Sequence, residues 1–216
     1  MRILICVTVA LSILFSASPI MASMPAPAGV SSVGTSPSHI QVNWSYAYSA
    51  NGFYIERAPQ GTTMFVRIAT VGASARSYIN VGLYAETGYS YRVRAYKSNR
   101  NFSPYSSTVN ALTFPLQPPV ITFAPVPVPI ATTVNGIYSS ATIVSANVVV
   151  DGLRPTDAIS YFWAEKSGPN LATVVSPDQL TTQLSLPESG TYVFSFTATV
   201  TPDSGTILTA TKDLGN

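Results

Sequence analysis

His39 is the single histidine of this 216-residue chain. Histidine is the side chain that changes its charge near neutral pH, which suits it to act as a general acid or base. No second histidine accompanies it, and the only cysteine, Cys6, lies near the N-terminus. A multi-histidine metal site and a Cys-His pair are therefore excluded, and no Ser-His-Asp arrangement is expected. His39 stands beside Ile40 at the start of an expected strand, which indicates a solvent-exposed histidine at a strand edge.

Carboxylates are the remaining groups that could catalyse hydrolysis or bind a cation. Glycoside hydrolysis needs two carboxylates that face each other across a cleft, and Glu56 and Glu86 have no evident acidic partner. The other acids stand mostly beside Gly, Pro or Ser: Asp151, Asp157, Glu165, Asp178, Glu188, Asp203 and Asp213. They could form a weak calcium site between loops, but turn-forming residues are the better interpretation because no dense run of acidic ligands occurs. Without a phosphate loop or a nucleophile elbow, the chain is predicted to be non-enzymatic, with no metal and no cofactor.

The charge is divided unevenly between the two halves of the chain. Charged residues make up 9% of the sequence and the net charge is +2. Residues 23–113 hold seven basic and two acidic side chains, a net +5, whereas residues 114–216 hold three basic and seven acidic ones, a net −4. This polarity could dock the halves together, assemble copies head to tail, or attract an anionic partner. Nucleic acid is a poor candidate, because the chain as a whole is close to neutral.

Four side chains of the basic half form the candidate ligand-binding face. In the segment GYSYRVRAY every second residue suits a core, which leaves Arg92, Arg94 and Tyr96 facing outward. Tyr54 and Glu56 face outward on the expected neighbouring strand. Arginine beside tyrosine suits stacking and bidentate recognition of anions, so Tyr54, Arg92, Arg94 and Tyr96 are predicted to bind an acidic polymer or an acidic protein face. The alternative is a solvated sheet face in which the arginines pair with Glu56 and cover the rings.

The elements that would position this face are β-strands. From Val30 onward apolar residues alternate with period two, and turn signals recur at spacings of roughly 8–12 residues, as in a β-sandwich. The expected inward-facing sets of the first half are Ile40, Val42 and Trp44; Phe53 and Ile55; and Tyr89, Tyr91, Val93 and Ala95. Further strands are expected over residues 65–71 and from Ser106 to Leu112. Apolar spacing never holds a helical period over three turns, so no helix is predicted here.

The first half resembles a fibronectin type III domain over residues 26–113. The similarity is carried by the run from Asn51 to Thr113, by Trp44 as the core tryptophan, and by Leu83 and Tyr89 in the pattern L-x-x-x-T-x-Y. The resemblance implies a β-sandwich in which the phenol of Tyr89 bonds back to the backbone. Ala85 stands where the family usually has proline, a departure that we expect to cost little.

The second half is predicted to be another sandwich, joined by the stiff linker FPLQPP at residues 114–119. Strands are expected in ATIVSANVVV, AISYFWAEKSGP and TYVFSFTATV, with a turn region in SPDQLTTQLSLP and prolines 125, 127 and 129 on an edge strand. YFWAEKSGP and LPESGTYVFSFTATVTPDSG resemble the PKD type of immunoglobulin-like module, over about residues 118–214 within a predicted domain of 120–216. A generic bacterial immunoglobulin-like domain is the alternative.

The first 22 residues have the layout of a secretory signal peptide. Arg2 precedes the uncharged apolar run from Ile3 to Phe15, and small residues follow. Cleavage is expected after Ala22, with Ala28 as an alternative; an uncleaved anchor is disfavoured because a bilayer span needs about 20 apolar residues. Cys6 would leave with the signal, so the mature chain would contain no cysteine and no membrane span. We therefore expect a secreted, periplasmic or cell-surface protein.

Two functions fit these features. The first is an exported, non-catalytic two-module protein for adhesion, spacing or protein binding. The second is a carbohydrate-binding accessory of secreted polysaccharide-degrading enzymes, supported by 12 tyrosines, of which Tyr46, Tyr48, Tyr54, Tyr96 and Tyr105 are possible stacking platforms. The expected partner is an unknown protein or an anionic or neutral polysaccharide outside the cytoplasm.

Overall fold

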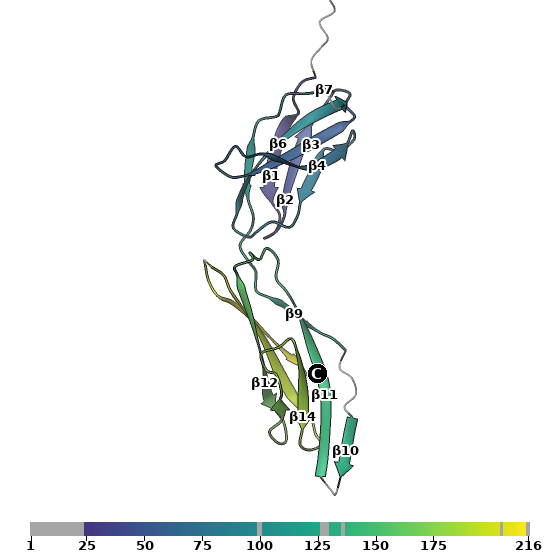
Figure 1. Ribbon diagram of the computed structural model, residues 1–216, viewed down its shortest axis with the longest axis vertical. Helices are drawn as coiled ribbons and strands as arrows, with labels where there is room; N and C mark the ends of the chain where they lie inside the picture. Colours follow the sequence, from purple (N-terminus) through teal and green to yellow (C-terminus); the bar gives the residue numbers. More distant parts are fainter. Residues whose placement is uncertain (1–23, 99–100, 126–129, 135–136, 204, 215–216) are drawn as a thin grey trace, which may run out of the picture.

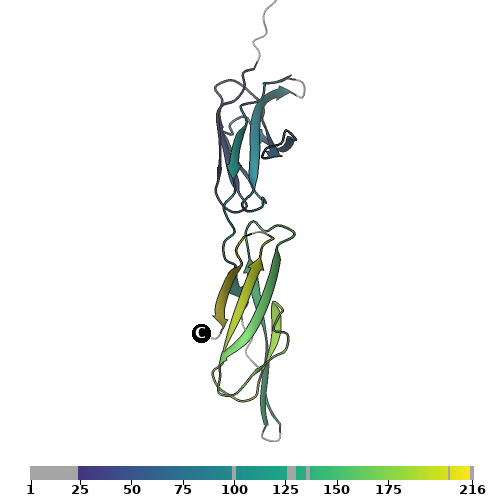
Figure 2. The ribbon, with the colours of Figure 1, turned by 90° about the vertical axis from the view of Figure 1, so that its left-hand side faces the viewer.

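The computed structural model describes residues 24–98, 101–125, 130–134, 137–203 and 205–214. Within these ranges the chain forms β-strands and no helix, arranged as two sandwiches placed end to end (Figures 1 and 2). The predicted fold class, all-β with two tandem immunoglobulin-like sandwiches, is thereby confirmed. The predicted signal peptide lies outside the described residues. No helix among those residues is long and apolar enough to cross a membrane.

The first domain packs a three-stranded sheet against a larger one. The strands of the three-stranded sheet follow the order β1 (Ala28–Gly34), β2 (Ile40–Ser45), β5 (Ser77–Asn80). The strands of the larger sheet follow the order β4 (Val66–Gly72), β3 (Gly52–Pro59), β6 (Gly88–Ser98), β7 (Asn101–Phe102). Strand β8 (Val109–Leu112) also pairs with β6. All of these pairs are antiparallel. In the constant-type immunoglobulin sandwich the fourth strand joins the sheet of the first two. Here β4 pairs with β3 instead, which widens the sheet that carries the predicted binding face.

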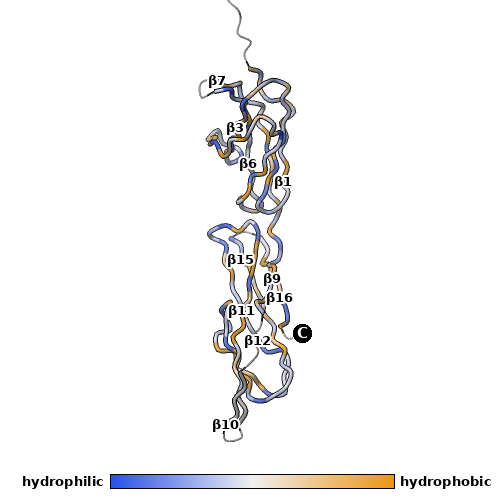
Figure 3. The backbone as a smooth tube through the Cα atoms, turned by 90° about the vertical axis from the view of Figure 1, so that its right-hand side faces the viewer, coloured by the Kyte–Doolittle hydropathy of each residue, from blue (hydrophilic) through white to orange (hydrophobic). Residues whose placement is uncertain are grey.

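The core of the first domain follows the predicted alternation. Ile40, Val42 and Trp44 of β2 are buried, as are Phe53 and Ile55 of β3. The inward row of β6, Tyr89, Tyr91, Val93 and Ala95, is buried as well. Figure 3 shows the resulting alternation of hydrophobic and hydrophilic residues along the strands. The predicted bond from Tyr89 to the backbone is present, because the Tyr84 N–H donates to its hydroxyl oxygen at 3.3 Å.

The second domain also consists of two antiparallel sheets. The strands of one sheet follow the order β10 (Ile130–Val134), β11 (Ile137–Val149), β14 (Thr181–Leu186), β13 (Thr173–Val174). Strand β9 (Val120–Phe123) pairs with the C-terminal end of β11. The strands of the other sheet follow the order β12 (Ala158–Ser167), β15 (Val193–Thr201), β16 (Leu208–Leu214). Trp163 and Phe196 meet at 4.6 Å between ring centroids in the middle of the core. The indole N–H of Trp163 donates to the Gln179 carbonyl oxygen at 2.9 Å, so this buried donor has a partner.

The interpretation of SPDQLTTQLSLP as a turn region is wrong in its second half. Residues Thr181–Leu186 form strand β14, which pairs with β11 over six residues. Its Thr182 and Leu184 are buried, while Thr181 and Gln183 are exposed. Strand β9 ends before Pro125, and Pro127 and Pro129 lie outside the described residues. The assignment of this sandwich to the PKD type stays a prediction.

A third apolar cluster joins the two domains. Ala85 of the first domain, Leu116 of the linker and Val200 of β15 are buried together. Partly buried residues of the second domain complete the cluster: Val150, Leu153, Ile159 and Leu208. Residues 114–119 contain no regular secondary structure, but Leu116 anchors them to this cluster. The linker is therefore anchored through Leu116, while Phe114, Pro115, Gln117 and Pro118 are exposed.

Candidate functional site

The four predicted ligand-binding residues lie together on the outer face of the larger sheet of the first domain. Register places Tyr54 opposite Arg94, and Tyr96 opposite Gly52, two pairs further along the same two strands. The rings of Tyr54 and Tyr96 are stacked, with centroids 4.5 Å apart and planes 12° apart. Tyr54 points away from the core, yet only 8% of it is exposed. We call this surface the arginine–aromatic face: Tyr54, Glu56, Arg67, Arg92, Arg94, Tyr96, Phe102 and Tyr105.

Arg92 is held inside the arginine–aromatic face by a charged network. Its Nε and Nη2 donate to Glu56 Oε2 at 2.9 and 2.6 Å, and the Tyr105 hydroxyl donates to Glu56 Oε1 at 2.6 Å. The guanidinium also lies 3.7 Å from the ring centroid of Tyr105 and 4.2 Å from that of Phe65. Burial, followed by the hydrogen bond to Glu56, raises the pKa of the Tyr105 hydroxyl. The charge of Arg92 is thus neutralised within the domain, in the way that the solvated-face alternative describes.

Arg94 and Arg67 differ from Arg92 because neither has an acidic partner in the described part of the chain. The Arg94 guanidinium lies 4.5 and 4.6 Å from the ring centroids of Phe102 and Tyr105, and its Nε is buried without a hydrogen-bond partner. Arg67 lies 4.5 Å from the ring centroid of Tyr54. Two arginines therefore keep an uncompensated positive charge while aromatic rings fix their orientation.

Sequence reasoning missed several members of the arginine–aromatic face. Arg67 lies on a predicted strand, but it has the same parity as Ala69 and Val71, which pack against the core. A register shift between Ile55 and Glu56 places Arg67 opposite Glu56, and simple alternation does not reveal this shift. Phe102 comes from the two-residue strand β7, and Tyr105 from the irregular segment that follows it. No periodicity of the sequence sets where such residues lie, so Phe102 was not found, and Tyr105 was named only as a possible stacking platform and not as a neighbour of the two arginines.

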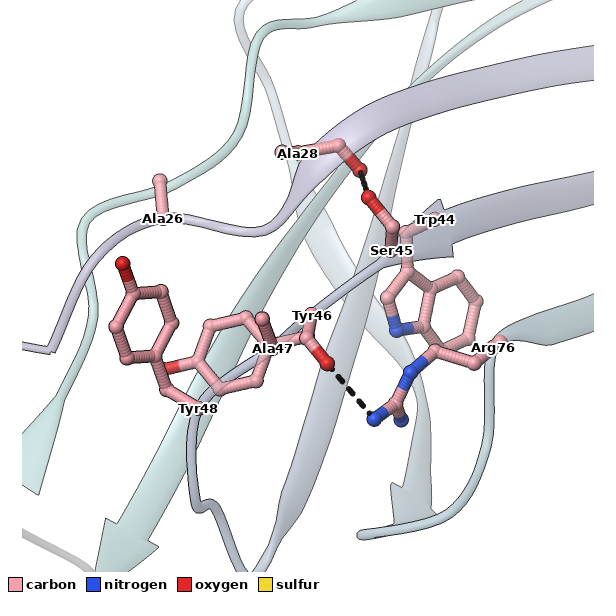
Figure 4. Close-up of a pocket in the computed structure, with 8 residues that line it drawn as sticks. All are labelled: Ala26, Ala28, Trp44, Ser45, Tyr46, Ala47, Tyr48 and Arg76. Carbon is pink, nitrogen blue, oxygen red and sulfur yellow. Dashed lines mark hydrogen bonds between the residues drawn. The ribbon is translucent and has the colours of Figure 1, made fainter.

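A pocket of about 380 Å³ opens at the other end of β2 from the second domain (Figure 4). Trp44, Ser45, Tyr46 and Tyr48 line it, together with Arg76 and three small residues, Ala26, Ala28 and Ala47. Arg76 Nη2 donates to the Tyr46 carbonyl oxygen at 3.0 Å, and its Nη1 donates to the carbonyl oxygens of Ala73 and Ala75. The guanidinium therefore braces two loops around the pocket. Tyr46 and Tyr48 were named from the sequence only as possible stacking platforms.

Ser36, His39 and Asp151 meet at the junction of the two domains, although no Ser-His-Asp arrangement was expected. Ser36 Oγ shares a hydrogen bond with His39 Nδ1 at 2.5 Å and donates to Asp151 Oδ2 at 2.9 Å. The same ring nitrogen of His39 lies 4.0 Å from Asp151 Oδ2. A catalytic triad needs the serine and the aspartate on opposite ring nitrogens. Because both contacts are on Nδ1, the cluster links the domains and does not activate the serine.

Asp151 is held in its charged form at this junction. Its partial burial alone would raise its pKa, but hydrogen bonds from Ser38 and Ser36, together with His39, lower it on balance. A lowered pKa means that this contact is present above the usual pKa of aspartate, about 3.9, and is lost as the pH falls through the lower folded value. No group of three or more His, Cys, Asp or Glu side chains in the described ranges is placed to hold a metal ion.

Ala85, at a position where fibronectin type III domains usually have proline, supplies a backbone bond between the domains. Its N–H donates to the Gly152 carbonyl oxygen at 2.8 Å, and its own carbonyl accepts from Arg154 Nη2 at 2.7 Å. Arg154 Nη2 also lies 3.3 Å from the Thr87 hydroxyl oxygen. Proline has no N–H and could not make the first of these bonds. The departure from the family pattern is therefore linked to domain docking, which the sequence alone did not reveal.

Replacing Ala85 by proline is expected to loosen the junction without unfolding the first domain. One interdomain hydrogen bond is lost, at a cost of about 1 kcal/mol, so amides of residues 150–153 should exchange with deuterium about fivefold faster. Ala85→Gly keeps the N–H and serves as the control. Equal exchange rates in the proline variant and the unaltered protein would contradict a role for this bond.

Comparison with known proteins gives no match to a protein-family model and no match to a curated protein sequence. Among solved structures, a Fn3-like protein from Clostridium thermocellum is similar with 28% identity and a TM-score of 0.37, covering 42% of this chain and 95% of that one. A fibronectin type III domain of human contactin 1 matches with 19% identity and a TM-score of 0.38, covering 49% and 94%. A segment of two fibronectin type III domains from chicken tenascin covers 88% of this chain and 99% of its own, with 14% identity and a TM-score of 0.40. The fold described above rests on the strand order and register, not on these similarities.

Proposed function

We propose that the protein is an exported, non-catalytic binding module that engages an acidic partner through the arginine–aromatic face. The partner is an acidic polysaccharide or the acidic face of a protein, met outside the cytoplasm: secreted, periplasmic or at the cell surface. The observation that carries the proposal is the pair Arg67 and Arg94, which have no carboxylate partner in the described ranges and are oriented by aromatic rings. Nucleic acid is not proposed, because the second domain is acidic.

The second domain has a positioning role in this proposal. Its junction with the first domain combines a buried apolar cluster with hydrogen bonds through Ala85, Asp151 and Arg154. A junction of this kind holds the arginine–aromatic face at a fixed orientation relative to the second domain. In this proposal the first domain binds the partner, and the second domain sets the orientation of the arginine–aromatic face.

Arg94→Gln tests the proposal through the salt dependence of binding. Polygalacturonate, an acidic polysaccharide, is the probe, and its affinity is measured by calorimetry at several salt concentrations. We expect about tenfold weaker binding and a shallower salt dependence for the variant, because charge-assisted contacts to the guanidinium are lost. Arg94 makes only ring contacts within the domain, so its replacement should leave the fold intact.

Lys97→Gln is the matched control, because Lys97 is an exposed cation at the end of the same strand but makes no contact with the rings of the face. It removes the same charge from the same domain. An equal loss of affinity in both variants would show that net charge alone attracts the polymer, and no binding by the unaltered protein would remove polygalacturonate-type ligands from the proposal.

A further inference from the structure

The pocket at the free end of the first domain is separate from both the arginine–aromatic face and the junction. It surrounds the end of β2 at Ser45, whereas Ser36, Pro37 and His39, next to the start of β2, contact the second domain. The pocket therefore lies at the end of the first domain that faces away from the second domain, and Figure 4 shows its lining residues. Nothing in the proposed function uses it.

Two buried donors of this pocket have no hydrogen-bond partner, namely Trp44 Nε1 and the Tyr46 hydroxyl. Other buried aromatic donors of the protein do have partners: Trp163 donates to the Gln179 carbonyl oxygen, and Tyr91 donates to Asn80 Oδ1 at 3.1 Å. Burying a donor without a partner is costly, and native structures rarely leave such groups. Five buried side-chain polar atoms of the described residues lack a partner, and the two that belong to aromatic residues both come from residues that line this cavity, which indicates a ligand that accepts hydrogen bonds there.

Tyr48 provides a flat apolar surface at the mouth of the pocket. It is 63% exposed, and its ring meets that of Tyr46 edge to face at a centroid distance of 5.7 Å. The neighbouring ring holds Tyr48 in place, while the rest of its surface faces solvent. An exposed aromatic ring beside buried donors fits a ligand that has one apolar flat side and several acceptor oxygens.

The charge of the pocket favours a neutral ligand. Among the described residues no acidic side chain lines it, which disfavours a cation. Arg76 is the one charged residue among the described residues that line the pocket. Its guanidinium already donates to three backbone carbonyl oxygens, so it has no free pair of N–H groups for a carboxylate or phosphate. The volume lies within the usual range of small-ligand sites, about 300–1,000 Å³. The small side chains of Ala26, Ala28 and Ala47 leave room for a ring.

We propose that this pocket binds one pyranose ring of a neutral polysaccharide. The apolar C–H face of the sugar stacks on Tyr48. Trp44 Nε1 and the Tyr46 hydroxyl have almost no solvent-accessible surface in the free protein, so the side chains around them must shift before the hydroxyl or ring oxygens of the sugar accept hydrogen bonds from these two donors. The site is independent of the arginine–aromatic face, so the protein would have two recognition surfaces, one for an acidic partner and one for a neutral glycan.

The test is binding to cellulose, chitin and starch, followed by calorimetry with hexamers of the retained polysaccharide. Tyr48→Ala should bind about tenfold more weakly, because an aromatic anchor at the centre of a site is removed. Tyr46→Phe deletes a single oxygen; it should bind the hexamer more weakly but unfold no more easily than the unaltered protein, because the hydroxyl has no partner in the free state. This combination separates ligand recognition from a structural role.

Tyr84→Ala is the matched control, since Tyr84 is a 41% exposed tyrosine of the same domain that lies next to the junction residue Ala85. It should bind as the unaltered protein does, and so should Arg94→Gln. The proposal is overturned if none of the three polysaccharides retains the protein, if Tyr48→Ala binds as tightly as the unaltered chain, or if Tyr84→Ala loses as much affinity as Tyr48→Ala.

Discussion

Glu56→Ala is expected to lower the free energy of unfolding of the first domain by about 3 kcal/mol. The substitution leaves Arg92 without its carboxylate partner and the Tyr105 hydroxyl without its acceptor. Removing one member of a buried ion pair costs about 3–5 kcal/mol, and the low end applies because the Arg92 side chain is 27% exposed. Urea unfolding followed by tryptophan fluorescence measures the change, since each domain contains one of the two tryptophans.

Glu86→Gln is the control for that experiment, because Glu86 is an exposed glutamate of the same domain. It should change the free energy of unfolding by less than about 0.5 kcal/mol. If Glu56→Ala were as mild as this control, the network of Glu56, Arg92 and Tyr105 would contribute little, and the arginine–aromatic face would not be a fixed surface.

Gly152→Ala is expected to separate the two domains. A methyl group at this position would lie 2.7 Å from the Pro37 carbonyl oxygen and 2.8 Å from Pro37 Cβ, both in the other domain. Overpacking of this kind costs about 2 kcal/mol, so the undocked fraction should rise roughly 30-fold. Small-angle X-ray scattering detects the change as a shift from one elongated particle to a flexible pair.

Gly61→Ala separates the clash from backbone strain. Gly152 has a φ of +85° and Gly61 a φ of +83°, so alanine is equally strained at both positions. Nothing lies within 4 Å of a methyl group at Gly61. Scattering from this variant should match that of the unaltered protein. Identical scattering from Gly152→Ala would mean that the Pro37 contact does not hold the domains together.

Strands that bury one face were predictable from the sequence. Tyr192, Phe194, Phe196 and Ala198 are all buried, as their alternation indicated. Strand β14 was missed because most of its residues are polar and a turn signal precedes it, so the inward-facing Thr182 and Leu184 do not stand out as an apolar alternation. Strands β5 and β16 were also missed, since they are defined by pairing with β2 and β15 rather than by a strong pattern of their own.

The candidate sites were predictable only where the alternation of side chains along a strand determines which face of the sheet a residue lies on. Parity correctly grouped Tyr54, Arg92, Arg94 and Tyr96 on one side of the sheet. It could not show that Tyr54 is covered by its neighbours, because the cover includes Phe102 of the two-residue strand β7 and Arg67, which a register shift places beside Tyr54. The pocket and the bond from Ala85 to Gly152 join segments far apart in sequence, and only the folded chain brings them together.

The relative orientation of the two domains is the central claim, and a distance between spin labels tests it most directly. The mature chain would contain no cysteine once Cys6 has left with the signal, so two introduced cysteines can be labelled alone. Thr70 of β4 and Gln183 of β14 are exposed positions, one in each domain. Pulsed electron paramagnetic resonance of the Thr70→Cys, Gln183→Cys protein should give one narrow distance distribution that broadens when Gly152→Ala is added. A broad distribution in the protein without Gly152→Ala would contradict the account.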